Sequence, residues 1–180
     1  MEHSLEETMA LLARTPRALN ALLRDLPEAW TLRNEGDGTW SVFDVIGHLI
    51  DGERVNWMLR AKWILQFGES PAFEPFDREG HKREGAGKSL GELLDEFARV
   101  RVGNIEELSR WDLSPERLSA RGKHPAFGVV TLSQLLATWA THDLTHLHQI
   151  SRVMAYQNRD AVGPWKQYLG VLRCTGHSGD

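Results

Sequence analysis

Four segments of the chain begin with the same helix-start signal and continue with apolar residues at helical spacing. The signal is a Ser or Thr followed three positions later by a carboxylate or amide side chain, the pattern of a capping box. It occurs at Ser4, Ser41, Ser89 and Thr131. Because apolar residues then recur about every 3.6 positions, the sequence predicts four long amphipathic helices. We place them at about 4–26, 41–68, 89–111 and 131–157.

The residues between and after these helices carry turn signals. Pro16 predicts a kink or break in the first helix, with Thr15 as a fresh N-cap. A connection rich in Pro, Gly and charge runs from 69 to about 88, Ser114 caps one extra turn, and a short helix follows Pro164. We expect no strands, because no stretch alternates with a two-residue period. The prediction is an all-α four-helix bundle with a long connection between helices two and three and a short C-terminal helix.

Length and composition fit one globular domain. The chain has 180 residues, 41% hydrophobic and 26% charged, and we assign 1–174 to a single domain and 175–180 to a disordered tail. A net charge of −4 without a Lys/Arg run argues against nucleic acid as a partner. No apolar run is long enough to span a membrane. The single Cys174 and the absence of a signal-peptide pattern predict a reducing, cytoplasmic location.

The fourth predicted helix carries two histidines, His142 and His146, four positions apart. On a helix this spacing places both rings on one face, one turn apart. His48 lies in an apolar run of the second helix. Neutral imidazole is the commonest transition-metal ligand, so these three side chains are candidate ligands of a divalent ion, with zinc or nickel favoured and iron, cobalt or copper as alternatives. The competing interpretation is that the histidines are hydrogen-bonded residues of a structural core.

Several carboxylates lie near the candidate ligands on the same two helices, where they can orient a ring nitrogen from behind. They are Asp44, Asp51, Glu53 and Asp143. Asp143 stands where the H-E-x-x-H metalloprotease pattern has Glu, so we do not predict peptide hydrolysis. His148 points elsewhere on the helix, and the remaining histidines are expected to matter little to the site. These are His3, His81, His124 and His177.

The sequence resembles the DinB-like (damage-inducible, YfiT-related) superfamily. The resemblance rests on the run from Trp40 to Leu49, on His142 to His146 followed by Gln149 and Ile150, and on 161–165. It covers nearly the whole chain. It implies a bundle with an up-down-down-up helix order and a divalent metal held by three histidines, here His48, His142 and His146. Some members of the family transfer low-molecular-weight thiols to electrophiles, or use such thiols in isomerisation.

The leading hypothesis is therefore a metal-dependent thiol S-transferase that joins a small-molecule thiol to an electrophilic substrate. The metal would lower the pKa of the thiol and present a thiolate, and Asp143 or Glu53 would orient a ligand or assist proton transfer. One alternative is a non-catalytic metal-binding or stress-response module. Another is a purely structural bundle without metal. We also expect a homodimer.

Overall fold

The predicted long helices are present, and each begins where its capping signal predicts. The computed structural model describes residues 4–77 and 79–174. In it α1 (Leu5–Leu12), α4 (Val42–Val55), α7 (Leu90–Ser109) and α9 (Leu132–Tyr156) start directly after Ser4, Ser41, Ser89 and Thr131. Each cap oxygen accepts the backbone N–H three residues on, at 3.1–3.3 Å. The reciprocal half of the capping box is formed at all of these except Ser4.

Two of the four long helices are interrupted. The first is divided into α1 and α2 (Thr15–Leu23), as Pro16 predicts. The prediction that Thr15 is the new N-cap is wrong: Arg14 occupies that position, and the Thr15 hydroxyl donates to the Leu11 carbonyl at 3.4 Å. The second is divided at Asn56 into α4 and α5 (Trp57–Phe67). Backbone hydrogen bonds continue across Asn56, so the two parts form one long rod.

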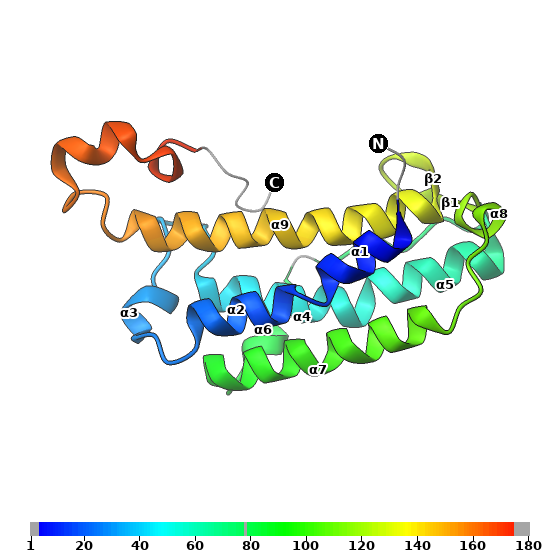
Figure 1. Ribbon diagram of the computed structural model, residues 1–180, viewed down its shortest axis with the longest axis horizontal. Helices are drawn as coiled ribbons and strands as arrows, with labels where there is room; N and C mark the ends of the chain where they lie inside the picture. The colour runs from blue at the N-terminus through cyan, green and yellow to red at the C-terminus, as the bar shows by residue number, and fades with distance from the viewer. Residues whose placement is uncertain (1–3, 78, 175–180) are drawn as a thin grey trace.

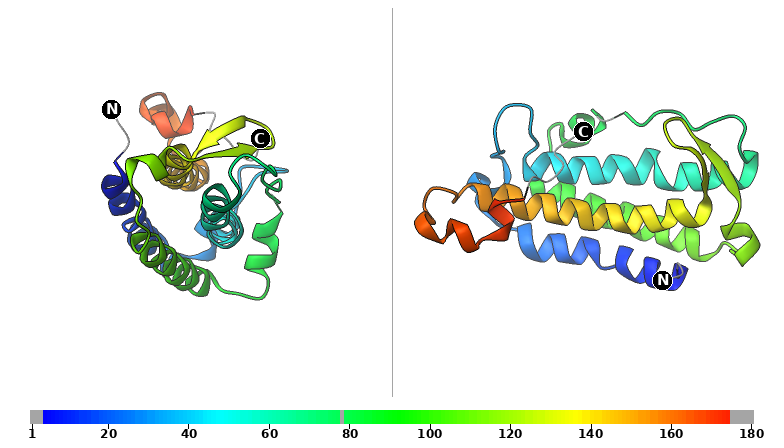
Figure 2. Two further views of the ribbon diagram at one scale, coloured as in Figure 1. Left: turned by 90° about the vertical axis from the view of Figure 1, so that its right-hand side faces the viewer. Right: turned by 90° about the horizontal axis from the view of Figure 1, so that it is seen from above.

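The helix order is up-down-down-up, as predicted. In Figure 1 the α1–α2 rod runs from right to left, α4–α5 and then α7 run from left to right, and α9 returns to the left. The α7 direction requires the connection after α5 to travel back along the bundle. Neighbouring rods are therefore parallel in two pairs, α1–α2 beside α9 and α4–α5 beside α7 (Figure 2).

A β-hairpin corrects the expectation that the chain has no strands. β1 (Arg121–His124) pairs antiparallel with β2 (Gly128–Thr131), with Arg121 opposite Thr131 and His124 opposite Gly128. Each strand has only four residues, too few to show a two-residue period. Gly128 has a φ of +73°, which suits glycine at the end of the turn. Thr131 both ends β2 and caps α9.

Short helices occupy the connections. α3 (Glu28–Thr31) and α6 (Gly80–Gly85) were not predicted, whereas α8 (Pro115–Leu118) begins after Ser114 as expected. The short C-terminal helix is present as two 3₁₀ turns, η1 (Gly163–Tyr168) and η2 (Gly170–Leu172). The tail assigned to 175–180 lies outside the described residues. Among the helices described, none is long and apolar enough to cross a membrane.

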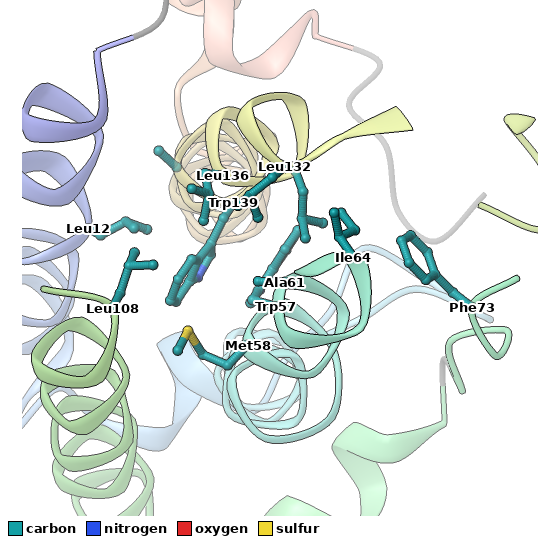
Figure 3. Close-up of a cluster of buried hydrophobic side chains, with 12 residues drawn as sticks. Leu12, Trp57, Met58, Ala61, Ile64, Phe73, Leu108, Leu132, Leu136 and Trp139 are labelled. Atoms are coloured by element: carbon teal, nitrogen blue, oxygen red, sulfur yellow. The ribbon is translucent and has the colours of Figure 1, made fainter. Parts of the chain in front are cut away.

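The apolar core has two parts, one toward each end of the bundle. The first joins α1, α5, the C-terminal half of α7 and the N-terminal half of α9. In Figure 3 the Trp139 side chain extends from α9 toward Met58, with Leu12 and Leu108 on one side and Trp57 on the other. The second joins α2, α4, the N-terminal half of α7 and the C-terminal half of α9.

Between these two parts the long rods place buried polar side chains. Along α9, Asp143 and His146 lie between Ala140 of the first part and Ile150 of the second. Glu53 occupies the corresponding position on α4, and Arg101 that on α7. Buried polar groups destabilise a fold unless they are paired. The buried polar side chains therefore make the middle of the bundle the candidate location of a functional site.

Candidate metal centre

Three histidine rings converge in this middle layer from two antiparallel helices. His48 comes from α4, and His142 and His146 from successive turns of α9. The Nε2 atom of His142 lies 3.2 Å from Nε2 of His48 and 3.0 Å from Nε2 of His146. One ring nitrogen of each residue can be chosen so that all lie within 4.8 Å of one another. The structure thus brings together the three residues predicted as ligands.

The ring of His146 is oriented by Gln149. Its Nδ1 lies 2.7 Å from Oε1 of Gln149, and because that oxygen can only accept, Nδ1 must donate. The proton is therefore on Nδ1, which leaves the Nε2 lone pair facing the other two rings. Gln149 is 2% exposed, so water does not compete for this hydrogen bond. The sequence contained this signal, since Gln149 follows His146 by three positions on the same helical ridge.

Burial keeps the imidazoles neutral. Desolvation lowers the pKa of His142 to about 2, with further lowering by His146, His48 and Arg101. Desolvation also lowers the pKa of His146, against an opposing effect of its hydrogen bond with Gln149. At neutral pH these rings are uncharged and keep the lone pairs that a metal ion needs.

Aromatic side chains surround the histidines. The ring of Trp40 lies 4.9 Å from that of His48, Phe76 makes an edge contact with His48 at 5.6 Å, and Trp57 makes one with His142 at 5.0 Å. The site is therefore largely dry apart from the edge at His142, which is partly exposed while His48 and His146 are each 8% exposed.

His81, which was expected to matter little to the site, is buried in a helix beside it. It lies in α6, is 4% exposed, and its ring is 4.7 Å from that of Trp40, the same indole that contacts His48. The helix α6 packs on α4 so closely that a Cβ on Gly47 would lie 2.8 Å from the His81 carbonyl oxygen. The connection after α5 thus covers the outer side of the turn that carries His48. The six-residue α6 gives no periodic signal in the sequence.

The two carboxylates predicted to assist the site, Glu53 and Asp143, are engaged by Arg101. Its guanidinium donates to both Asp143 oxygens at 2.6 and 2.9 Å and to Oε1 of Glu53 at 2.8 Å. The Trp139 indole donates to the same Glu53 oxygen at 2.7 Å, and Asn104 donates to Oε2 at 2.9 Å. These contacts favour a structural or electrostatic role for the pair over proton transfer.

Arg101 is a residue that the sequence interpretation missed. Its spacing gave a signal, because Phe97, Arg101 and Leu108 lie on one face of α7 and all are buried. A charged residue at an inward position predicts a buried partner. Of the other predicted carboxylates, Asp44 belongs to the Ser41 capping box and Asp51 lies 3.5 Å from Arg83.

An open surface depression of about 450 Å³ lies along α9 and includes His142. Among the described residues its lining is uncharged: Gln134, Ala137, Thr138, Thr141, His142 and Thr145. His148 lies on another face of the same helix, exposed, with its Nε2 3.2 Å from Sγ of Cys174. His148 thus lies outside the cluster, as predicted, and its contact is with Cys174.

The sequence matches a known family model and is similar to two proteins from other organisms. The model of the DinB superfamily matches residues 11–150. A putative metal-dependent hydrolase of Oceanobacillus iheyensis is 29% identical over 144 residues, covering 76% of this chain and 77% of the relative. Another protein of that name, from Geobacillus thermodenitrificans, is 30% identical over 151 residues, covering 81% of this chain and 82% of the relative.

A solved structure shares the fold. YfiT from Bacillus subtilis, described as a probable metal-dependent hydrolase with an unusual four-helix bundle topology, superposes with a TM-score of 0.71. The match covers 88% of this chain and 87% of YfiT at 19% sequence identity. At that identity the similarity establishes the architecture.

Proposed function

Because this chain belongs to the DinB superfamily, and because three histidines meet in its middle layer, we propose that it is a metal-dependent enzyme. In this proposal His48, His142 and His146 hold one divalent ion. Zinc and nickel are the preferred ions, since both accept imidazole ligands, with iron, cobalt or copper as alternatives.

The observation that carries the proposal is the convergence of the Nε2 atoms. Metal–nitrogen bonds of about 2.0–2.1 Å at angles between 95° and 110° place two ligand nitrogens roughly 3.0–3.4 Å apart. The separations of 3.2 and 3.0 Å fit this range. In a purely structural core an Nε2–H of His142 could donate to only one of the other two rings at a time, whereas one bound ion would satisfy all three nitrogens.

A divalent ion in this position would lower the pKa of a small protic molecule bound to it and so supply a nucleophile at neutral pH. The residues of this chain supply the rest. Gln149 fixes the His146 ring, Trp40, Phe76 and Trp57 exclude water, and the partly exposed edge of His142, which borders the surface depression on α9, is where reactants would approach.

Within this class we propose transfer of a small-molecule thiol to an electrophile as the reaction. A free thiol has a pKa near 8.5, far closer to neutrality than that of water, so it needs less activation. That difference matters here because Glu53 and Asp143 are occupied by Arg101. Both carboxylates are also 0% exposed, which disfavours a role as general base toward water.

Hydrolysis is the second candidate, favoured by the names of the two relatives and of YfiT. The same metal-loaded protein is to be assayed against a panel of electrophiles with and without low-molecular-weight thiols, and against esters and amides without thiol. Turnover that requires thiol supports transfer. Turnover of esters or amides without thiol supports hydrolysis.

The matched variants are His142→Ala and His148→Ala, two histidines of the same helix of which one lies outside the cluster. Activity should be lost in the first and kept in the second. Metal-loaded protein that turns over no substrate of either panel would contradict the enzymatic proposal and favour a non-catalytic metal-binding module.

A further inference from the structure

The buried middle layer contains an ionic cluster that the proposed reaction does not use. The Arg101 side chain is 1% exposed, and those of Glu53 and Asp143 are 0% exposed. One guanidinium is thus paired with two carboxylates, which leaves a formal charge of −1 within the cluster. Taking charges out of water destabilises a fold by several kcal/mol per ion unless the partners compensate. A net negative charge buried at this depth needs a compensating positive charge nearby.

The cluster is held rigidly by all four rods of the bundle. Arg101 and Asn104 come from α7, Glu53 from α4, and Asp143 and Trp139 from α9. The α1 rod contributes the Leu12 carbonyl, which accepts from Arg101 at 2.9 Å. The bidentate pairing of Arg101 with Asp143 fixes the turn of α9 between His142 and His146. Fixed charges in a dry interior act over longer distances than the same charges in water.

The three histidines offer a metal ion no charge of their own. A dication bound by neutral imidazoles keeps its full +2, and the rings, Trp40, Phe76 and Trp57 are all uncharged. One nearby excess charge is that of the cluster, whose carboxylates sit on the same helices as the ligands; Asp51 on α4 is a further buried carboxylate, and it lies 3.5 Å from Arg83. Asp143 directly follows His142, and Glu53 is five residues after His48. The negative charge of Asp143 raises the pKa of His146, whereas the positive charge of Arg101 lowers the pKa of His142, so the carboxylate side of the cluster acts on the His146 end of the site.

We propose that the Glu53–Arg101–Asp143 cluster is the fixed counter-charge of the metal centre and sets its affinity for divalent ions. This rests on the proposed metal site. Arg101 acts as a positioning residue: it holds two carboxylates together that would otherwise repel, and it leaves one unit of negative charge behind the ligands. The cluster acts on the ion through space, without contacting it.

The test is a titration of metal-free protein with Co²⁺, comparing the wild type with Glu53→Gln. This change removes the charge with little change of shape: the amide oxygen can still accept from Trp139 and Arg101, and the amide NH₂ replaces the Oε2 atom that accepts from Asn104. We expect Co²⁺ to bind about 10–100-fold more weakly, with the visible absorption spectrum of the bound ion unchanged. Glu106→Gln is the matched control, because it removes an exposed carboxylate from α7, and it should bind as the wild type does.

Asp143→Asn removes the same unit of charge from α9 and serves as the test if Glu53→Gln does not fold. A folded variant of either kind that binds Co²⁺ as tightly as the wild type overturns the inference. So does weaker binding accompanied by an altered Co²⁺ spectrum, because the cluster would then act by shaping the ligands. If wild-type protein itself binds no Co²⁺ or other divalent ion, the metal site proposed above fails as well.

Discussion

At the scale of single residues, the site depends on side chains that fix the direction of a lone pair. His146 can present Nε2 only while its Nδ1 proton is held, and Gln149 holds it at 2.7 Å. In other proteins, mutation of a side chain that hydrogen-bonds to a metal ligand lowers the metal affinity by about 10–100-fold. The role of Gln149 is thus separable from that of the ligands.

We predict that Gln149→Leu weakens metal binding by about tenfold or more without unfolding the bundle, because the His146 ring loses its acceptor and can rotate or change tautomer. Isothermal titration of the metal-free protein measures the change. Gln149→Glu keeps an acceptor oxygen and should bind at least as tightly as the wild type. Equal affinities for the Leu and Glu variants would show that the hydrogen bond has no such role.

The site residues that could be predicted from the sequence were those marked by helical spacing. His48, His142 and His146 could be grouped from spacing and burial pattern, and the resemblance joined them into one site. Arg101 had an equally clear position on α7, but the identity of its partners depended on how three other rods face it. A sequence pattern shows that a charge is inward; it does not show which opposite charge it meets.

At the scale of elements, the close packing of α6 on α4 shields the histidine turn. Gly47 allows it, since a Cβ there would meet the His81 backbone oxygen at 2.8 Å. Gly103 lies in α7 with nothing within 4 Å of its would-be Cβ. The two glycines share helical backbone and differ in what faces them.

Gly47→Ala should therefore destabilise the protein by about 1–3 kcal/mol, as α6 is displaced. Gly103→Ala should stabilise it by up to about 1 kcal/mol, through helix propensity alone. Urea denaturation of both variants measures the difference. A Gly47→Ala protein as stable as the Gly103→Ala protein would mean that α6 does not pack on α4 in this way.

A network of charges also ties α6 and α4 to α7. Lys88 donates to Glu96 at 2.6 Å, and Arg54 pairs with both Glu96 and Glu84. The Lys88 hydrogen bond and the nearby Arg54 charge hold the pKa of Glu96 below its usual range. A carboxylate with a lowered pKa in the folded state stabilises the fold above its ordinary pKa, and this contribution is lost as the pH falls through the lowered value.

Glu96→Gln should consequently lower the melting temperature at pH 7, and its difference from the wild type should shrink as the pH is reduced from about 5 to about 3. Thermal scans across that range, with Glu106→Gln as the exposed control on the same helix, provide the measurement. A difference that stays constant with pH would assign the effect to packing.

Elements that form from local signals were predictable, and those that form from tertiary contacts were not. The capping boxes at Ser41, Ser89 and Thr131 marked helix starts correctly because cap and helix are neighbours in sequence. The hairpin and α6 have four to six residues per element. Such short pieces are stabilised by what they pack against, which a sequence period cannot reveal.

At the scale of the whole molecule, the up-down-down-up order explains where the site lies. It sets α4 antiparallel beside α9, so that His48 near the middle of one meets His142 and His146 near the middle of the other. Apolar clusters on either side close the bundle around this layer. The helix order came from the resemblance, since periodicity alone does not fix the direction of α7.

The central claim is that this layer holds one divalent ion through His48, His142 and His146. The most direct measurement is the metal content of protein purified without an affinity tag, by elemental analysis, for the wild type, His146→Ala and His148→Ala. We predict about one ion per chain in the wild type and in His148→Ala, and almost none in His146→Ala. Metal-free wild-type protein that takes up no ion on addition, or full metal content in His146→Ala, would contradict the account.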